Sequence, residues 1–313
     1  VVAVNGDVYD SGGRLIAEGD RVVPGANVSC GNCYYCRNDY PYYMCMSLDD
    51  YGNSLHIGIA PHLLGGWAEY MYVLPGTPIF RVPETLPDEI AVMTEVMAVT
   101  HGIEIAQAVL GMFGANKFGH SVAVLGVGPL GMCHLAKAAM LGAEKLIATD
   151  LFDTRLGIAE KFGASLTMNS ASTTEAERIE LAKQATDGLG PQIVIDCSGV
   201  TSTFTEALHM VRPGGVVIEA GTFVDMGPVE VNPNIDFCTR NVTVIGIGGE
   251  TGAAYEPSLR LMDANQHRYP FLDLITHRAP LESAQWGVEI AQDSTSMQVV
   301  IDPWAIEPTS KPL

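Results

Sequence analysis

Residues 126–131, Gly-Val-Gly-Pro-Leu-Gly, constrain the fold of this chain more than any other stretch. The glycines follow the apolar run 121–125 directly, and the next segment repeats its apolar residues at helical spacing. A second apolar run then ends in Asp150, 19 residues after Gly131. The pattern G-x-G-x-x-G between a strand and a helix, with an acid at this distance, predicts a dinucleotide-binding site in a doubly wound parallel sheet.

Each position of the motif has an expected role. Gly126 permits a tight turn, Gly128 lets a pyrophosphate approach the backbone, and Gly131 lets helix and strand pack closely. Pro129 and Leu130 open the helix, where free N–H groups and the helix dipole favour phosphate. We therefore expect the pyrophosphate at the start of this helix.

Asp150 indicates which dinucleotide is bound. Its carboxylate is expected to accept hydrogen bonds from the adenosine ribose and to repel a 2′-phosphate, which favours NAD over NADP. Arg155 is the nearby base that could weaken this preference or stack on adenine instead. The alternative is a glycine turn with only a structural role, in a doubly wound protein of another kind.

The remaining pattern extends the sheet to six strands. Further strand-like runs lie at 165–168, 192–196, 215–221 and 242–246, separated mostly by helical segments that include 153–162, 175–186 and 202–211. Strands that alternate with helices predict an α/β, parallel, Rossmann-type sheet. Ligands bind outside the carboxyl ends of such strands, so the turns there are expected near the nicotinamide half. The residues concerned are Cys197, Gly199, Gly221, Thr222 and Gly246.

Four cysteines, Cys30, Cys33, Cys36 and Cys45, follow the spacing C-x2-C-x2-C-x8-C. Four thiolates with no open position are typical of a closed, structural zinc site. Two disulfides, free thiols or a DNA-binding zinc ribbon are the alternatives. A formal net charge of −19 argues against nucleic acid as a partner. The other cysteines, Cys133, Cys197 and Cys238, are expected in the core.

Other segments carry weaker signals. Five tyrosines around the cysteines are expected to cover the lobe or face a neighbouring subunit, with a substrate channel as the alternative; they are Tyr34, Tyr35, Tyr40, Tyr42 and Tyr43. Residues 87–112 predict one helix, and residues 65–74 predict a turn followed by a strand. Residues 1–23 predict two strands joined by a turn at 11–13, and the run 297–303 predicts a final strand outside the alternation.

Several motifs together resemble the zinc-containing alcohol dehydrogenases of the medium-chain dehydrogenase/reductase family, in a branch like the sorbitol and threonine dehydrogenases. They are GDRVVPG (19–25), the four cysteines, GGWAEY (65–70), VAVLGVGPLG (122–131), RPGGVVIEAG (212–221) and VVIDP (299–303). The resemblance implies a GroES-like, mainly β catalytic domain at 1–98 with its zinc lobe at 29–46. It further implies an NAD-binding Rossmann domain at 99–265 and a return to the catalytic domain at 266–313.

The resemblance also implies a second, catalytic zinc. Glu95 occupies the place of a family ligand, although Val96 and Met97 replace the family's Pro-Leu; a helix-surface carboxylate is the alternative. His101 is expected to position other groups by hydrogen bonding. The implied reaction interconverts a secondary alcohol or polyol and its ketone, with zinc as Lewis acid and NAD as hydride acceptor.

The family's Gly-His-Glu motif does not occur in these 313 residues. Because Val1 lies within a strand-like run, we expect upstream sequence to supply the remaining ligands. The alternatives are an NADH-dependent carbonyl reductase of secondary metabolism and, if residue 1 is the true start, an inactive nucleotide-binding protein. The expected partner is a small alcohol or ketone. We expect a cytoplasmic homo-dimer or homo-tetramer, and no membrane partner, because no apolar run reaches 18 residues.

Overall fold

The computed structural model describes residues 1–112, 114 and 120–311, and the chain divides into two compact units. Within the described residues, unit 1 contains Val1–Ala98, Gly249–His267 and residues 274–311, and unit 2 contains Val99–Gly248 and Arg268–Asp273. These units differ from the expected domains at two places: residues 249–265 pack with unit 1, and residues 268–273 pack with unit 2. None of the helices in the described part of the chain combines the length and hydropathy needed to span a bilayer.

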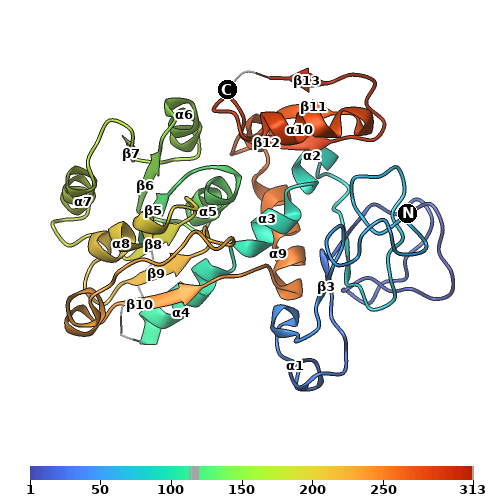
Figure 1. Ribbon diagram of the computed structural model, residues 1–313, viewed down its shortest axis with the longest axis horizontal. Coiled ribbons are helices and arrows are strands. Elements are labelled where there is room, and N and C mark those ends of the chain that lie inside the picture. The colour runs from blue at the N-terminus through green and yellow to red at the C-terminus, as the bar shows by residue number, and fades with distance from the viewer. Residues whose placement is uncertain (113, 115–119, 312–313) are drawn as a thin grey trace. The chain divides into compact units, whose positions relative to one another are not determined.

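Unit 2 is built on a six-stranded parallel sheet, as the apolar runs predicted (Figure 1). Its strand order is β10-β9-β8-β5-β6-β7, so the chain winds outward from β5 in both directions. The strands are β5 (Ser121–Leu125), β6 (Lys145–Asp150), β7 (Leu166–Asn169), β8 (Ile193–Asp196), β9 (Val216–Glu219) and β10 (Thr243–Gly246). This order brings the carboxyl ends of β5 and β8, which are neighbours, to one edge of the sheet.

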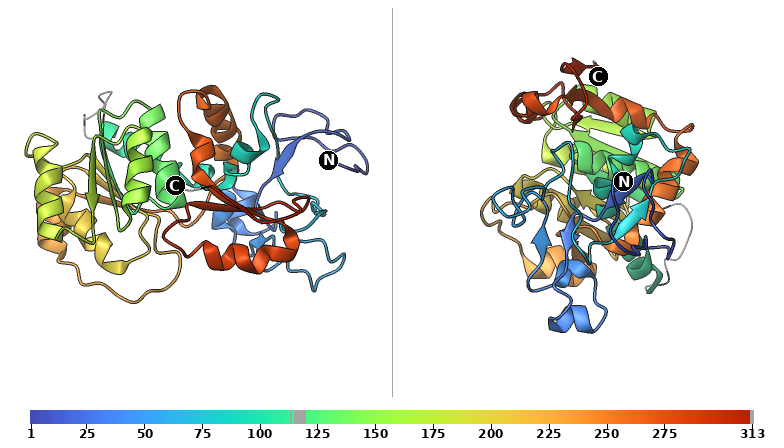
Figure 2. Two further views of the ribbon diagram at one scale, coloured as in Figure 1. Left: turned by 90° about the horizontal axis from the view of Figure 1, so that it is seen from above. Right: turned by 90° about the vertical axis from the view of Figure 1, so that its right-hand side faces the viewer.

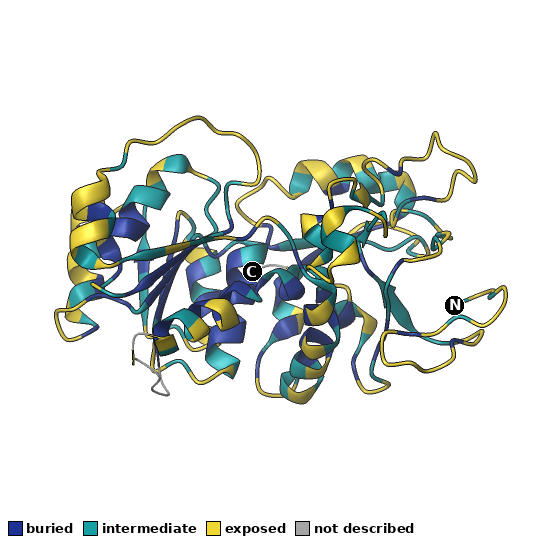
Figure 3. Ribbon diagram, turned by 90° about the horizontal axis from the view of Figure 1, so that it is seen from below, coloured by how far each residue is buried: buried dark blue, intermediate teal, exposed yellow. Residues whose placement is uncertain are grey.

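Helices cover both faces of this sheet (Figure 2). They are α4 (Gly102–Met112), α5 (Pro129–Met140), α6 (Asp153–Lys161), α7 (Glu175–Gln184) and α8 (Thr201–Met210). Short helical turns follow at η2 (Pro233–Phe237), η3 (Cys238–Arg240) and η4 (Phe271–Leu274). Because both faces are covered, the inner strands are nearly continuous runs of buried apolar residues (Figure 3).

Unit 1 contains three small sheets. β1 (Val22–Pro24) pairs antiparallel with β4 (Ile79–Arg81), and β2 (Asn27–Val28) pairs with β3 (Asp49–Asp50). The third sheet has the order β12-β11-β13, from β11 (Ile275–Ala279), β12 (Gln298–Ile301) and β13 (Thr309–Ser310). Its β12 is the predicted final strand, and it lies in unit 1, outside the parallel sheet. The helices are α1 (Tyr34–Arg37), η1 (Tyr42–Met44), α9 (Gly252–Asn265), η5 (Leu281–Ser283) and α10 (Ala284–Ile290).

The single helix predicted over 87–112 is wrong. The segment forms α2 (Asp88–Ala91), α3 (Thr94–Val99) and α4. The hydroxyl of Thr94 donates to the carbonyl of Ala91 at 2.5 Å, where α2 ends, and α3 ends where the chain passes from unit 1 to unit 2. The helical period continues through the breaks because each short helix buries its own apolar face.

Three other expectations also differ from the structure. No strand forms among residues 65–74, where Tyr70 and Tyr72 are half exposed, because no neighbouring strand pairs with this backbone. Residues 1–8 form no strand, and the expected hairpin is reduced to the bridge Tyr9–Leu15. Cys238 is exposed on η3, whereas Cys133 is buried as expected.

Candidate cofactor and metal sites

The glycine loop between β5 and α5 has no room for side chains at two positions. A Cβ at Gly126, whose φ is +82°, would meet Ser198 Cα at 2.7 Å. A Cβ at Gly131 would meet the carbonyl oxygen of Gly126 at 1.9 Å. At Gly128 the nearest atom to a Cβ would be Arg155 Nη1 at 3.6 Å, an ordinary van der Waals contact, so this position is not tightly packed. The loop is therefore tightly packed at Gly126 and Gly131 but not at Gly128, as an approaching pyrophosphate requires.

The first turn of α5 is available to an anion. Pro129 occupies the start of the helix, and the N-cap Gly128 offers no side-chain oxygen to its N–H groups. With 12 residues, α5 also carries a helix dipole with its positive end at this turn. These features make the loop and helix start a site for phosphate.

Asp150 ends β6 beside this loop and is held in place by backbone groups. It is only 7% exposed, and its Oδ2 accepts the N–H of Val127 at 3.0 Å. Its Oδ1 accepts the N–H of Phe152 at 3.1 Å, and Arg155 Nη1 lies 3.9 Å from the same oxygen. The guanidinium of Arg155 lies 5.0 Å from the centre of the Phe152 ring. Arg155 thus already stacks on an aromatic ring of its own chain.

The turns after β8 and β9 pack tightly against each other. A Cβ at Gly221 would meet the carbonyl carbon of Cys197 at 2.8 Å and the nitrogen of Gly199 at 2.9 Å. The hydroxyl of Thr222 donates to Glu219 Oε1 at 2.6 Å, which also accepts the N–H of Thr222. Both turns are therefore closely packed. Gly246, at the end of β10, is exposed with open space around it.

Cys197 is a packed thiol rather than a nucleophile. Its Sγ lies 3.6 Å from Nδ1 of the buried His134, and burial raises the pKa of the thiol well above its ordinary value. Sequence reasoning did not identify its neighbour Asp196, which is fully buried at the end of β8. Burial, together with the charge of Glu219, raises the pKa of Asp196 to about 6, although hydrogen bonds from Ser198 and Thr203 oppose this.

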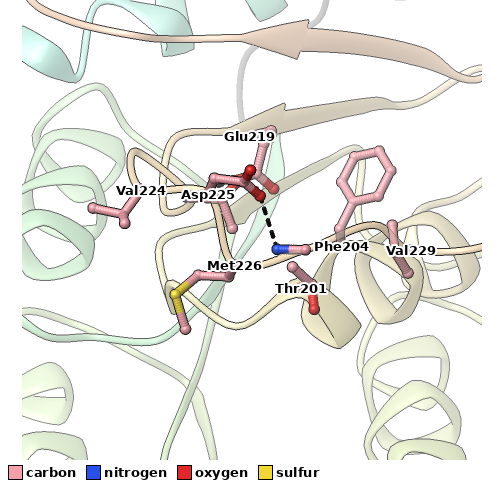
Figure 4. Close-up of a pocket in the computed structure, with 9 residues that line it drawn as sticks. Thr201, Phe204, Glu219, Val224, Asp225, Met226 and Val229 are labelled. Carbon is pink, nitrogen blue, oxygen red and sulfur yellow. Dashed lines mark hydrogen bonds between the residues drawn. The ribbon is translucent and has the colours of Figure 1, made fainter.

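A pocket of about 310 Å³ lies at the carboxyl end of β9 (Figure 4). Apolar side chains alternate in it with two carboxylates, Glu219 and Asp225, and the latter accepts the N–H of Gly227 at 2.9 Å. It is lined by Thr201, Phe204, Glu219, Thr222, Val224, Asp225, Met226, Gly227 and Val229. Two carboxylates make a poor site for phosphate, so the pyrophosphate is expected at α5 and not here.

The four clustered cysteines converge on one point. All four sulfur atoms lie within 4.8 Å of one another, with 3.5 Å between Cys33 and Cys36 and 4.0 Å between Cys33 and Cys45. Tetrahedral zinc with Zn–S bonds of about 2.3 Å places its sulfurs roughly 3.8 Å apart. N–H groups of Cys36 and Met46 lower the pKa of the Cys33 thiol to about 6. The donor set and its spacing fit a closed zinc site, and Cys45 joins it despite its longer gap.

Glu95 lies on α3 beside a second acid that the sequence did not indicate. It shares a hydrogen bond with Glu250, and burial, followed by the charge and hydrogen bond of Glu250, raises the pKa of Glu95 to about 7. Glu250 Oε1 accepts the hydroxyl of Tyr42 and, at 3.1 Å, that of Tyr255. Burial, as the first cause, raises the pKa of both phenols, so both remain donors. Tyr42 and Glu250 are 208 positions apart, which explains why no sequence spacing revealed them.

This group does not by itself fit a catalytic zinc. Such a site takes three protein ligands and commonly includes His or Cys. Glu95 and Glu250 supply oxygen only, and within the described ranges the four cysteines are the only cluster of three or more metal-ligating side chains. The described residues thus supply at most part of such a site. His134 and His101 belong to unit 2.

Comparison with known proteins identifies the family to which each unit is similar. The zinc-binding dehydrogenase family matches residues 129–264, and the alcohol dehydrogenase GroES-like domain matches residues 2–84. An erythritol/L-threitol dehydrogenase from Mycolicibacterium smegmatis is 30% identical, over 92% of this chain and 74% of that protein. An L-threonine 3-dehydrogenase from Francisella tularensis is 27% identical, over 91% and 76%. The crystal structure of an alcohol dehydrogenase from Thermotoga maritima has a TM-score of 0.87 at 28% identity, over 96% and 81%.

A Rossmann unit with a glycine loop, joined to a GroES-like unit with four clustered cysteines, defines a class of nicotinamide-dependent, zinc-containing oxidoreductases. The chain belongs to the zinc-containing alcohol dehydrogenases of the medium-chain dehydrogenase/reductase family. The predicted family and its two folds are thereby confirmed, together with zinc and a nicotinamide as its cofactors.

Proposed function

We propose that this protein interconverts a secondary alcohol or polyol and its ketone, with NAD as the hydride acceptor. The observation that carries the proposal is the glycine loop against α5 with Asp150 fixed beside it. In the oxidative direction a hydride passes from the carbinol carbon to C4 of the nicotinamide, and the hydroxyl proton is released. The polyol named for the M. smegmatis relative supports a substrate with adjacent hydroxyl groups.

The roles of the cofactor residues follow from their positions. Gly126, Gly128 and the start of α5 hold the pyrophosphate, and Asp150 accepts the hydroxyls of the adenosine ribose. Asp150 is nearly buried, and Arg155 is stacked on Phe152. A 2′-phosphate would therefore lie beside the Asp150 carboxylate, with the nearby guanidinium already engaged by an aromatic ring. NAD is therefore the proposed cofactor. The turns at Cys197–Gly199, Gly221–Thr222 and Gly246 are proposed for the nicotinamide half.

Two metal roles are proposed. Cys30, Cys33, Cys36 and Cys45 hold one structural zinc, which the closeness of their sulfur atoms supports. Glu95 is one ligand of a catalytic zinc. The described residues supply too few donors to complete that second site.

The protein is further proposed to be a cytoplasmic homo-dimer or homo-tetramer. In the described sheet of unit 2, β10 is an edge strand, and Val244 on it is 36% exposed. An open sheet edge with an exposed apolar residue supports pairing with a second copy. Sedimentation of the purified protein measures the oligomeric state directly.

The test of function is a panel of secondary alcohols and tetritols incubated with NAD or NADP, followed by NADH absorbance. We expect oxidation of at least one polyol with NAD, and the reverse reaction with its ketone and NADH. Gly131→Ala serves as the reference with weakened NAD binding, because its Cβ would displace the phosphate loop. The absence of activity on every substrate of the panel, with either cofactor and in both directions, would contradict the proposal.

A further inference from the structure

Two tyrosines from distant parts of the chain hold Glu250, the buried member of the acid pair in unit 1, whose partner Glu95 is half-buried. Glu250 is 4% exposed and Tyr255, on α9, is fully buried. Tyr42 comes from the cysteine lobe, where η1 lies between Cys36 and Cys45. The phenols of both tyrosines donate to the same oxygen, Glu250 Oε1.

Packing fixes both phenols. The ring of Tyr255 stacks on Phe80 with centroids 4.5 Å apart, and its oxygen accepts the N–H of Ala26 at 3.1 Å. The ring of Tyr42 lies against Gly252 at the start of α9, where a Cβ would be 3.4 Å from Tyr42 Cε1. These contacts hold both rings beside Glu250.

We propose that the cysteine lobe positions Glu95 through this hydrogen-bonded chain, in the order Tyr42, Glu250, Glu95. Tyr42 and Glu250 are then positioning residues that act through Glu95, and the inference rests on the proposed role of Glu95 in the reaction. The lobe would have a task beyond bracing its own loop, because it delivers the phenol that orients the acid pair.

The geometry explains why such a connection matters. A hydrogen bond between two carboxyl groups needs one of them to be protonated, so that it can donate, and the other to accept. Glu250 Oε1 already accepts two phenols, which fixes the rotation of this carboxyl group. Glu95 hydrogen-bonds to Glu250, so loss of the Tyr42 contact loosens the carboxyl group on which the position of Glu95 depends. A lobe that is only a brace would leave Glu95 unaffected when the Tyr42 hydroxyl is removed.

The connection can be measured by 19F NMR of the full chain labelled with 3-fluorotyrosine. The Tyr42 resonance is assigned by its absence in Tyr42→Phe. We expect it to shift in Glu250→Gln and in Glu95→Gln, and on removal of the lobe zinc by a chelator. Glu84→Gln, a change at an exposed residue, is the matched control and should leave it in place. An unchanged chemical shift of the Tyr42 resonance in Glu250→Gln or after zinc removal would overturn the proposal.

Kinetics distinguish positioning from stability. Tyr42→Phe should lower kcat about tenfold, the lower end of what partners of ligating residues usually contribute, and leave the Kd for NAD unchanged. Tyr35→Phe, in the same lobe, should change neither. An unchanged kcat in Tyr42→Phe refutes the positioning role. If the protein oxidises no alcohol, the proposed function fails while the NMR experiment still decides whether lobe and acid pair are coupled.

Discussion

Replacement of Gly131 by alanine tests the phosphate loop at its tightest contact. The new Cβ would lie 1.9 Å from the carbonyl oxygen of Gly126, and real Cβ contacts almost never fall below 3.0 Å. Both contact partners belong to backbone, so α5 and the loop must separate by roughly 1 Å. Overpacking of this kind costs about 1–3 kcal/mol, partly offset by the better helix propensity of alanine, about 1 kcal/mol.

The larger effect should fall on NAD. Hydrogen bonds to a charged group contribute about 1.5–3 kcal/mol each, so the loss of one N–H contact to the pyrophosphate corresponds to at least a tenfold rise in Kd. Calorimetric titration with NAD and denaturant unfolding measure both effects. Gly157→Ala in α6 is the matched control, because its Cβ would meet nothing within 4 Å. Equal NAD affinity in Gly131→Ala and wild type would refute the assignment of this loop.

Three further outcomes are expected. Asp150→Asn should weaken NAD about tenfold and narrow the preference over NADP, because a charged acceptor becomes neutral; titrations with both cofactors check this, and an unchanged ratio of the two Kd values would count against the role of Asp150. Cys45→Ser should remove the structural zinc and unfold the lobe, since structural zinc binding is worth about 10–16 kcal/mol in peptides; elemental analysis should find less zinc per chain, and wild-type zinc content would contradict the four-sulfur site. Burial lowers the pKa of His134 from 6.5 to about 4, so the unfolded chain binds a proton that the folded chain rejects as pH falls from 6.5 towards 4. Stability should fall by roughly 3 kcal/mol across that window. His134→Gln should flatten the profile and the exposed His56→Gln should not, as unfolding at several pH values would show.

The parallel sheet could be predicted from the sequence because its signals are local. A strand buried on both faces is a short apolar run, and each such run here, from 121–125 to 242–246, became a strand of the sheet. The glycine loop was equally readable, since Gly126 needs a positive φ and Gly131 has no space for a Cβ. These requirements act within a few residues of the chain.

The acid pair could not be predicted, because it depends on tertiary contacts. Glu250 follows two glycines after β10 and has no pattern of its own. Its neighbours Tyr42 and Tyr255 reach it from the cysteine lobe and from α9, and only the packing of unit 1 brings them together. The strand predicted within residues 65–74 was wrong for a related reason, since a strand needs a partner strand that no local signal reveals.

The claim that this protein transfers hydride from a secondary alcohol to NAD is tested most directly with a labelled substrate. The protein is incubated with NAD and an accepted polyol that carries deuterium on its reacting carbinol carbon, and the NADH formed is examined by NMR. Direct transfer predicts deuterium at C4 of the nicotinamide, on one face of the ring. NADH without deuterium, or deuterium distributed over both faces, would contradict it.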